Sequence, residues 1–131
     1  MAKSEKRKIG DIGEGIACKY LVRKGYVVLE RNYWKPWGEI DIIAEKDRIL
    51  TFVEVKSVSL PTGRQVSRES DYRPEENLYP AKLRRLHRAI QTYLLDHKVP
   101  ETKQWQIDLA CVRIDFTAKK GRVELLENIV L

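Results

Sequence analysis

Cysteine, histidine and long apolar segments are all scarce in this chain, and each scarcity argues against a class of protein. The 131 residues include two cysteines and two histidines. Cys18 and Cys111 are far apart and have no metal-ligand spacing, so we expect two buried thiols and neither a disulfide nor a catalytic cysteine. His87 and His97 also have no partners at metal spacing, and we expect them at a helix surface or a helix end.

No apolar run approaches the length of a signal-peptide core or of a membrane span. We therefore expect a cytoplasmic protein with no membrane partner. There is no internal repeat and no low-complexity linker, and a chain of 131 residues suits a single domain spanning 1–131. A hydrophobic content of 43% predicts a globular core, and a charged content of 34% predicts a well-solvated surface.

Positive charge is abundant, with a net charge of +6, and it is concentrated in two segments. Residues 1–8, expected to form a basic tail, hold four cations and one acid, and residues 80–98 hold five cations and one acid. Such segments are typical of a surface that binds nucleic acid, although a solvated tail and helix face would have the same composition. Together with the segment 58–79, they supply the expected nucleic-acid contacts: Lys3, Lys6, Arg7, Lys8, Arg64, Arg68, Lys82, Arg84, Arg85 and Arg88.

Apolar periodicity and turn residues predict the order of helices and strands. The expected elements are a helix at 9–24, a strand at 26–33, two strands within 38–56, a helix at 80–98, and strands at 105–114 and 122–129. Between them, 58–79 is a long loop of the kind that is usually functional or disordered. Asp108 falls inside a predicted strand, where we expect a capped or edge-exposed aspartate rather than a further acid of a site.

Residues 38–56, GEIDIIAEKDRILTFVEVK, bring acidic side chains onto two adjacent strands. The polar stretch 45–48 is typical of a tight hairpin turn, and pairing across it places Asp41 near Glu54. Two carboxylates about 5 Å apart repel by roughly 3 kcal/mol at an effective dielectric constant near 20. A divalent cation such as Mg²⁺ would relieve this repulsion, because it commonly takes one or two carboxylates and leaves its other positions to water and phosphate.

Side chains alternate along a strand, so Lys56 projects to the same side as Glu54, and Glu39 to the same side as Asp41. An ammonium in that place can orient a water molecule or neutralise charge that grows on a phosphate. The alternative is a structural ion pair between Lys56 and Glu54 on a solvated sheet face.

Aromatic residues precede the acidic strand in the segment 33–37, YWKPW. Aromatic rings beside positive charge can stack on unpaired bases. They can equally cover the end of a small core, and we expect this packing role.

The order of a helical Glu14, then GEID, then FVEVK is similar to that of the PD-(D/E)xK nuclease superfamily, and most closely to its YraN-like branch. The stretches that match lie at 13–21 (GEGIACKYL), 25–26 (GY), 31–33 (RNY), 38–44 (GEIDIIA), 52–57 (FVEVKS) and 73–86 (RPEENLYPAKLRRL). The resemblance covers most of the chain. Two departures are the residues Glu39-Ile40 in place of the superfamily's proline before Asp41, and the length of the loop 58–79.

This resemblance implies a restriction-endonuclease-like α/β fold, an α-β-β-β-α-β(-β) sandwich with a central mixed sheet flanked by helices. It also implies an endonuclease that uses Mg²⁺ or Mn²⁺ to hydrolyse DNA. Asp41 and Glu54 would hold the metal, with the carbonyl of Val55 as a further ligand. Lys56 would position the attacking water, and Glu14 would assist through a metal-bound water or a second cation.

The resemblance also implies that Lys82 contacts a phosphate and that Glu39 is a possible accessory acid. Archaeal Holliday-junction resolvases share the acidic skeleton more distantly, so branched DNA is a possible substrate, and cutting two strands would favour a homodimer. Two alternatives remain: a nucleic-acid-binding module or partner subunit that keeps the fold but cleaves little, and an interaction protein whose acidic strands bind a basic partner.

Overall fold

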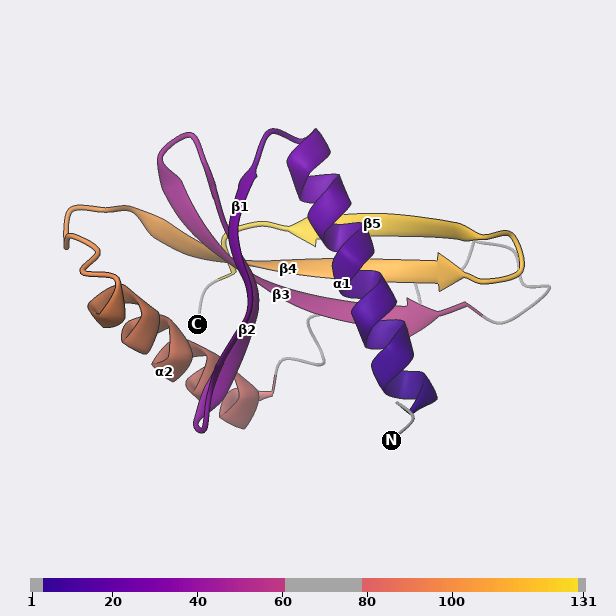
Figure 1. Ribbon diagram of the computed structural model, residues 1–131, viewed down its shortest axis with the longest axis horizontal. Coiled ribbons are helices and arrows are strands. Elements are labelled where there is room, and N and C mark those ends of the chain that lie inside the picture. Colours follow the sequence, from indigo (N-terminus) through magenta and orange to yellow (C-terminus); the bar gives the residue numbers. More distant parts are fainter. Residues whose placement is uncertain (1–3, 61–78, 130–131) are drawn as a thin grey trace.

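A computed structural model describes residues 4–60 and 79–129 of the chain (Figure 1). Its elements are α1 (Glu5–Arg23), β1 (Val27–Lys35), β2 (Gly38–Lys46), β3 (Ile49–Ser59), α2 (Pro80–Asp96), β4 (Trp105–Asp115) and β5 (Lys120–Leu126). The strands form one sheet in the order β1-β2-β3-β4-β5, in which β3 and β4 are parallel and the other neighbours are antiparallel. The predicted α/β fold with a central mixed sheet and helices is confirmed. Neither helix has the length and apolar character that crossing a membrane requires.

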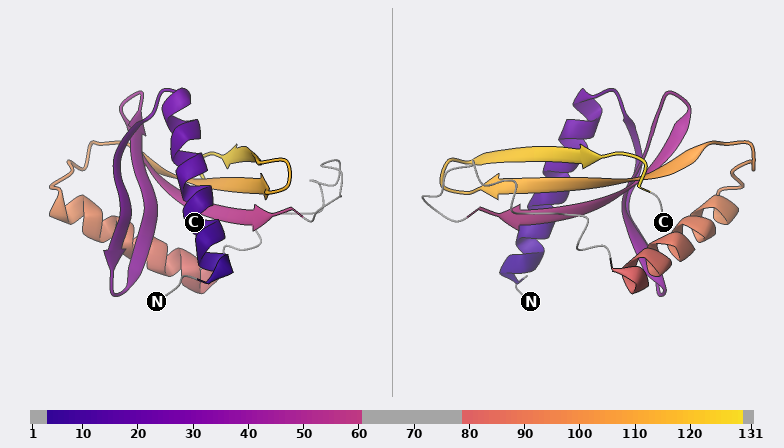
Figure 2. Two further views of the ribbon diagram at one scale, coloured as in Figure 1. Left: turned by 45° about the vertical axis from the view of Figure 1, so that its right-hand side comes forward. Right: turned by 180° about the vertical axis from the view of Figure 1, so that it is seen from behind.

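The two helices pack against different parts of the sheet, each over its own core (Figures 1 and 2). Ile42 and Val53 pair across β2 and β3 and belong to the core beneath α1. The next pair, Ile43 and Phe52, belongs to the core beneath α2. Alternation along the strands therefore supplies both cores from the same two segments.

This alternation breaks at Asp41. Ile40 and its partner Tyr33 lie in the core beneath α2, although Ile42, two residues from Ile40, lies beneath α1. Between the paired positions, Asn32 lies opposite Asp41 and has a φ of 54°, a left-handed conformation that asparagine tolerates better than most residues. Beyond this point the β1–β2 hairpin turns across the other strands, as Figure 1 shows. Asp41 thus lies at the bend where β2 leaves β3.

Two glycines allow the helices to approach the strands that carry the acids. A Cβ atom at Gly13 of α1 would collide with the side chain of Ser57 on β3. A Cβ atom at Gly38 of β2 would collide with the main-chain carbonyl of Arg85 on α2. Any larger residue would force these elements apart, so both glycines set the spacing around the acidic strands.

The structure corrects the boundary of the predicted N-terminal tail. The helix begins at Glu5 rather than at residue 9, because Ser4 caps it by accepting a hydrogen bond from the backbone N–H of Arg7 (3.2 Å). The segment expected to be a basic tail is therefore helical from residue 5 onward.

Other boundaries differ by a few residues. Strand β1 continues to Lys35, and β3 continues through Ser59, so residues 58–59 are strand rather than loop. The helix α2 ends two residues earlier than expected, and β5 spans 120–126 rather than 122–129. The predicted hairpin turn is a two-residue turn of Asp47 and Arg48, both with positive φ, which matches the right-handed twist of the flanking strands. The rest of the predicted loop, 61–78, lies outside the described residues.

Candidate functional site

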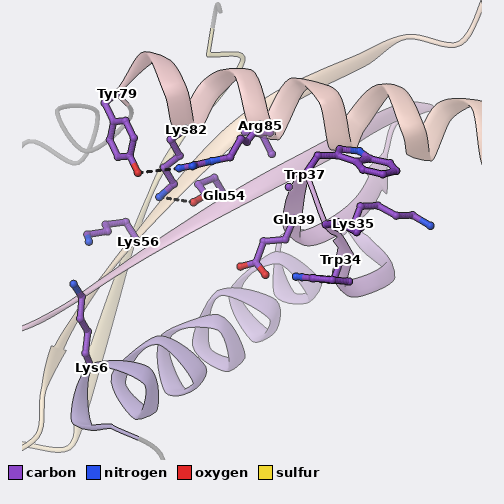
Figure 3. A pocket seen from close by; sticks show the side chains of 13 residues that line it. Lys6, Trp34, Lys35, Trp37, Glu39, Glu54, Lys56, Tyr79, Lys82 and Arg85 are labelled. Atoms are coloured by element: carbon purple, nitrogen blue, oxygen red, sulfur yellow. Dashed lines mark hydrogen bonds and ion pairs between the residues drawn. The ribbon is translucent and has the colours of Figure 1, made fainter.

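A cavity of about 540 Å³ opens between the tip of the β1–β2 hairpin, β3, the start of α2 and the first turn of α1 (Figure 3). Its lining combines five cationic side chains, two carboxylates and three large aromatic rings. The lining residues are Lys6, Trp34, Lys35, Pro36, Trp37, Gly38, Glu39, Glu54, Lys56, Tyr79, Lys82, Arg85 and Leu86. This is a positively charged hollow with acids in its wall.

Glu54 lines this cavity, and Asp41 lies close behind it in the fold. The pairing of β2 with β3 ends at Ile42 and Val53, and Asp41 and Glu54 are the next residues of the two strands. Burial raises the pKa of Asp41 from its ordinary 3.8 to about 8, and the charge of Glu54 adds to the shift. The backbone N–H of Val55 donates a hydrogen bond to Oδ2 of Asp41 (2.8 Å) and partly opposes it. The structure thus brings the two predicted metal ligands together and holds one of them in an environment that disfavours its negative charge.

Two lysines approach Glu54 from different elements. Lys56 lies two residues along β3 and lines the same cavity. Lys82 reaches across from α2, and its Nζ lies 2.7 Å from Oε1 of Glu54 (Figure 3). Glu54 is 7% exposed, so this ion pair is shielded from solvent on the acid's side. The cationic partner of Glu54 in this structure is therefore Lys82, rather than Lys56 as the structural alternative supposed.

Glu14 lies on the other side of Asp41, on α1. It is 8% exposed, in contrast to an ordinary helix-surface glutamate. The Nε of Arg31 lies 3.4 Å from its Oε1, and the side chain of Asn32 also hydrogen-bonds it. Burial raises the pKa of Glu14, although the Arg31 guanidinium opposes that shift. Glu14 does not line the cavity but acts on Asp41 through its charge, which raises the pKa of that group.

Glu39 lines the cavity and is exposed. Its charge also raises the pKa of Asp41, so it lies within electrostatic reach of the acid pair. Within residues 4–60 and 79–129, no three or more His, Cys, Asp or Glu side chains come together as metal ligands. The donor set is the pair Asp41 and Glu54, and such a pair fits Mg²⁺, which fills its remaining positions with water and substrate oxygens.

The predicted nucleic-acid contacts divide into three groups. Lys6, Lys82 and Arg85 line the cavity. Arg88 lies over the ring of Trp37, with its Cζ 4.9 Å from the ring centroid, at the border of the cavity. The third group, which the structure places outside the cavity wall, consists of Arg7, Lys8 and Arg84.

The prediction took every cation of a segment together, and nucleic-acid contact by this third group stays a prediction. On a helix, successive side chains point in directions about 100° apart, so Arg84 does not share the direction in which Arg85 reaches the cavity. Lys8 is instead 3.5 Å from Glu5 on the exposed helix surface. Three further predicted contacts, Lys3, Arg64 and Arg68, lie outside the described residues.

The aromatic segment has mixed roles. Tyr33 is buried against Tyr93, with ring centroids 5.3 Å apart, and Trp37 donates a hydrogen bond from its Nε1 to Oγ1 of Thr92 (3.0 Å). For these two rings the expected packing role is confirmed. For Trp34 it is wrong, because 65% of this residue is exposed at the cavity.

Sequence reasoning missed several members of the site. The hydroxyl of Tyr79 accepts a hydrogen bond from Nη2 of Arg85 (3.0 Å), and a tyrosine directly before the helix-starting proline was the available signal. Arg31 was part of the matching stretch RNY, but its ion pair with Glu14 was not predicted. The opposite charges of the two residues were the available signal. Of the two alternatives expected for Asp108, the edge-exposed one is wrong: Asp108 is fully buried in β4, and its Oδ1 accepts hydrogen bonds from Gln106 and from the backbone N–H of Asn128.

Comparison with known sequences places these residues in a family. The model of the family described as "Uncharacterised protein family UPF0102" matches residues 13–118. The chain belongs to this family. The part that matches the UPF0102 model includes Glu14, the acid pair, Lys56 and Lys82.

The relatives match over most of their length. A UPF0102 protein of Campylobacter lari is 40% identical over 117 residues, which cover 89% of this chain and 88% of that protein. A UPF0102 protein of Helicobacter hepaticus is 37% identical over 125 residues, covering 95% of this chain and 96% of that protein.

Proposed function

We propose that this UPF0102 protein is a metal-dependent endonuclease that hydrolyses phosphodiester bonds in DNA. The observation that carries the proposal is the buried acid pair: Asp41, whose pKa is raised to about 8, lies beside Glu54, and Glu54 lines a cavity together with five cations. Strongly perturbed acids in a cleft are typical of functional sites. The similarity of the Glu14, Asp41, Glu54 and Lys56 order to the PD-(D/E)xK nuclease superfamily supports the same reaction.

Asp41 and Glu54 would hold Mg²⁺ or Mn²⁺, and the carbonyl of Val55, on the residue whose N–H bonds Asp41, would be a further ligand. When bound, the metal polarises a phosphoryl oxygen and lowers the pKa of a bound water. The raised pKa of Asp41 supports this assignment. The charge of a divalent cation would offset the repulsion between two neighbouring carboxylates.

The cations of the cavity have separate tasks in this proposal. Lys56, two residues from Glu54, positions the attacking water and offsets the charge that develops on the phosphate. Lys82, which pairs with Glu54 in this structure, would be the residue that binds the phosphate once Glu54 holds a metal. Lys6 and Arg85 bind neighbouring phosphates of the same strand, because they line the cavity on either side of the acids.

The two outer acids act through Asp41. Glu14 is held by Arg31 and fixes the electrostatic environment of Asp41 from the α1 side. Glu39 faces the cavity and assists as an accessory acid. Neither would be a direct ligand of the first metal ion.

One observation favours a second candidate function, a nucleic-acid-binding module that does not cleave. Lys82 already neutralises Glu54 at 2.7 Å, so the acid pair has a cationic partner without any metal. In that case the cavity binds phosphates while the ion pair keeps its wall rigid.

Cleavage of end-labelled single-stranded, duplex and branched DNA with Mg²⁺, and with EDTA instead, decides between these functions. We expect magnesium-dependent cleavage that Asp41→Asn and Lys56→Ala each reduce by about 100-fold or more, as removal of a positioned catalytic group does. Both variants should still bind DNA, with affinity that falls steeply as salt rises.

Glu101→Gln and Lys19→Ala are the matched controls, because both residues are exposed and neither lines the cavity. They should leave cleavage unchanged. Cleavage that survives in Asp41→Asn and Lys56→Ala would indicate a contaminating nuclease and reject the proposal. Salt-sensitive binding without cleavage in any metal would support the binding module.

A further inference from the structure

Trp34 is an exposed aromatic side chain at the functional cavity. It is 65% exposed, although its neighbours Tyr33 and Trp37 are held by packing and hydrogen bonding. Among the described residues its indole makes no hydrogen bond and no ring contact. A single exposed apolar residue is common on a protein surface, but this ring lines a cavity together with five cations, so a ligand of the cavity is the natural partner for it.

The backbone places this ring next to the acids. Trp34 pairs with Glu39 across the β1–β2 hairpin, and residues directly opposite each other in an antiparallel pair project to the same face. Glu39 in turn lies within electrostatic reach of Asp41. Figure 3 shows the indole beside Glu39, at the opposite end of the cavity from Lys6 and Lys56.

The hairpin tip that carries Trp34 is held firmly. Gly38 packs directly on the main-chain carbonyl of Arg85, and Trp37 bonds Thr92 of the same helix. The ring is therefore presented from a supported position rather than from a free loop. A flat surface that is already fixed loses little conformational entropy when a ligand stacks on it.

We propose that Trp34 is a stacking platform for an unpaired base, and that the substrate class is DNA with a single-stranded segment at the cavity. Bases stack on aromatic side chains in single-strand sites, where nearby cations follow the phosphates. In a duplex the faces of the bases are covered by their neighbours, so they cannot reach the indole. Lys56 and Lys6 at the far end would follow the backbone of the same strand. The inference rests on the proposed function in that it takes the cavity to be the DNA-binding site.

Equilibrium binding in EDTA tests the platform separately from cleavage. The probes are a fluorescein-labelled oligo-dT, an abasic strand of the same length, and a duplex, each followed by fluorescence anisotropy. The abasic strand keeps the phosphates and lacks the bases. The wild-type protein should bind oligo-dT more tightly than the abasic strand, and Trp34→Ala should lose this preference, with about a fivefold or greater loss of affinity for oligo-dT.

Trp34→Phe should restore most of the preference, because a ring remains at the position. Phe116→Ala is the matched control: it removes an exposed aromatic (46% exposed) that does not line the cavity, and affinity should not change. Because Trp34 is exposed, all variants should melt at nearly the wild-type temperature. Equal affinity of Trp34→Ala and wild type for oligo-dT, or an equal loss for the abasic strand and the duplex, would overturn the platform.

These outcomes are separable from failure of the nuclease proposal. Cleavage with no base preference would leave the nuclease standing and reject the platform. A base preference that depends on Trp34, without cleavage in any metal, would reject the nuclease and retain the platform on a binding module. Binding of neither strand would reject both and point to an exposed tryptophan that contacts a protein.

Discussion

The Nζ of Lys82 lies 2.7 Å from Oε1 of Glu54, at the carboxylate to which we assign the metal. Under the proposed function one acid serves two cations, an ammonium from α2 and a divalent ion from solution. The two would compete, because Glu54 is nearly buried and Lys82 already contacts one of its oxygens. DNA would favour the metal-bound arrangement by offering Lys82 a phosphate in exchange.

Replacing Lys82 with methionine should strengthen metal binding and weaken DNA binding. Without the competing ammonium, we expect the Kd for Mg²⁺ to fall by about fivefold, which corresponds to about 1 kcal/mol for a partly shielded ion pair. Isothermal titration with Mg²⁺ or Mn²⁺ measures the first effect, and anisotropy with labelled DNA the second. Lys82→Arg, which keeps the charge, should stay near the wild type. Unchanged metal affinity in Lys82→Met would mean that Glu54 is not a ligand.

The stability of the metal-free protein should fall as pH rises through the neutral range. The pKa of Asp41 is about 8 in the folded protein and 3.8 ordinarily. Between these values the unfolded chain has released the proton that the folded protein retains, so the free energy of unfolding decreases with rising pH. Below pH 3.8 both states hold the proton, and above about pH 8 both have lost it, so the Asp41 contribution is flat outside this window.

Urea unfolding in EDTA between about pH 5 and pH 8 measures this slope. Burial also raises the pKa of Glu14 and of Asp108, and both contribute with the same sign. The contribution of Asp41 is therefore the difference between the pH slopes of the unfolding free energy in wild type and in Asp41→Asn. We expect the smaller slope in Asp41→Asn. Mg²⁺ should reduce the wild-type slope, because it favours the ionised pair. Identical slopes in the two proteins would contradict the assigned environment of Asp41.

A pair of glycine substitutions should have opposite effects on stability. Gly38→Ala places a Cβ against the carbonyl of Arg85 and should destabilise the protein by about 1–3 kcal/mol, as overpacking does. Gly10→Ala meets no atom within 4 Å on the exposed surface of α1 and should stabilise it by about 0.5–1 kcal/mol through helix propensity. Thermal or urea unfolding measures both. A neutral Gly38→Ala would show that α2 can shift without cost, and would remove the support assigned to the hairpin tip.

Removing Arg31 should lower the free energy of unfolding, because the buried carboxylate of Glu14 then has no counter-charge. Arg31→Met leaves that carboxylate without its guanidinium partner, and we expect a loss of about 1 kcal/mol at neutral pH, limited because the Arg31 side chain is 45% exposed. Glu14→Gln in the same background should recover most of the loss, since a neutral amide needs no counter-charge. A double-mutant cycle of unfolding free energies measures the coupling. Additive single effects would mean that Arg31 does not compensate the charge of Glu14.

The acid pair was predictable because its causes are local. A period of two along β2 and β3, with a polar turn between them, is enough to bring Asp41 and Glu54 close together, next to the pair Ile42 and Val53. The partner of Glu54 was not predictable, because Lys82 belongs to a helix that only tertiary packing brings to β3. The exposure of Trp34 could not be predicted from the sequence for a related reason. Asn32 breaks the alternation of faces, and a left-handed residue inside a strand leaves no sequence period to detect.

Strands β3 and β4 run parallel, so the chain must return along the length of the sheet before β4 can form, and α2 lies on that return path. Lys82 arrives beside Glu54 through the same crossover that completes the sheet. A chain still emerging during synthesis carries the two groups on unconnected segments, and closing so long a loop is a late event. The Lys82–Glu54 ion pair is thus a marker of a completed chain, because it forms only after α2 has packed beside β3.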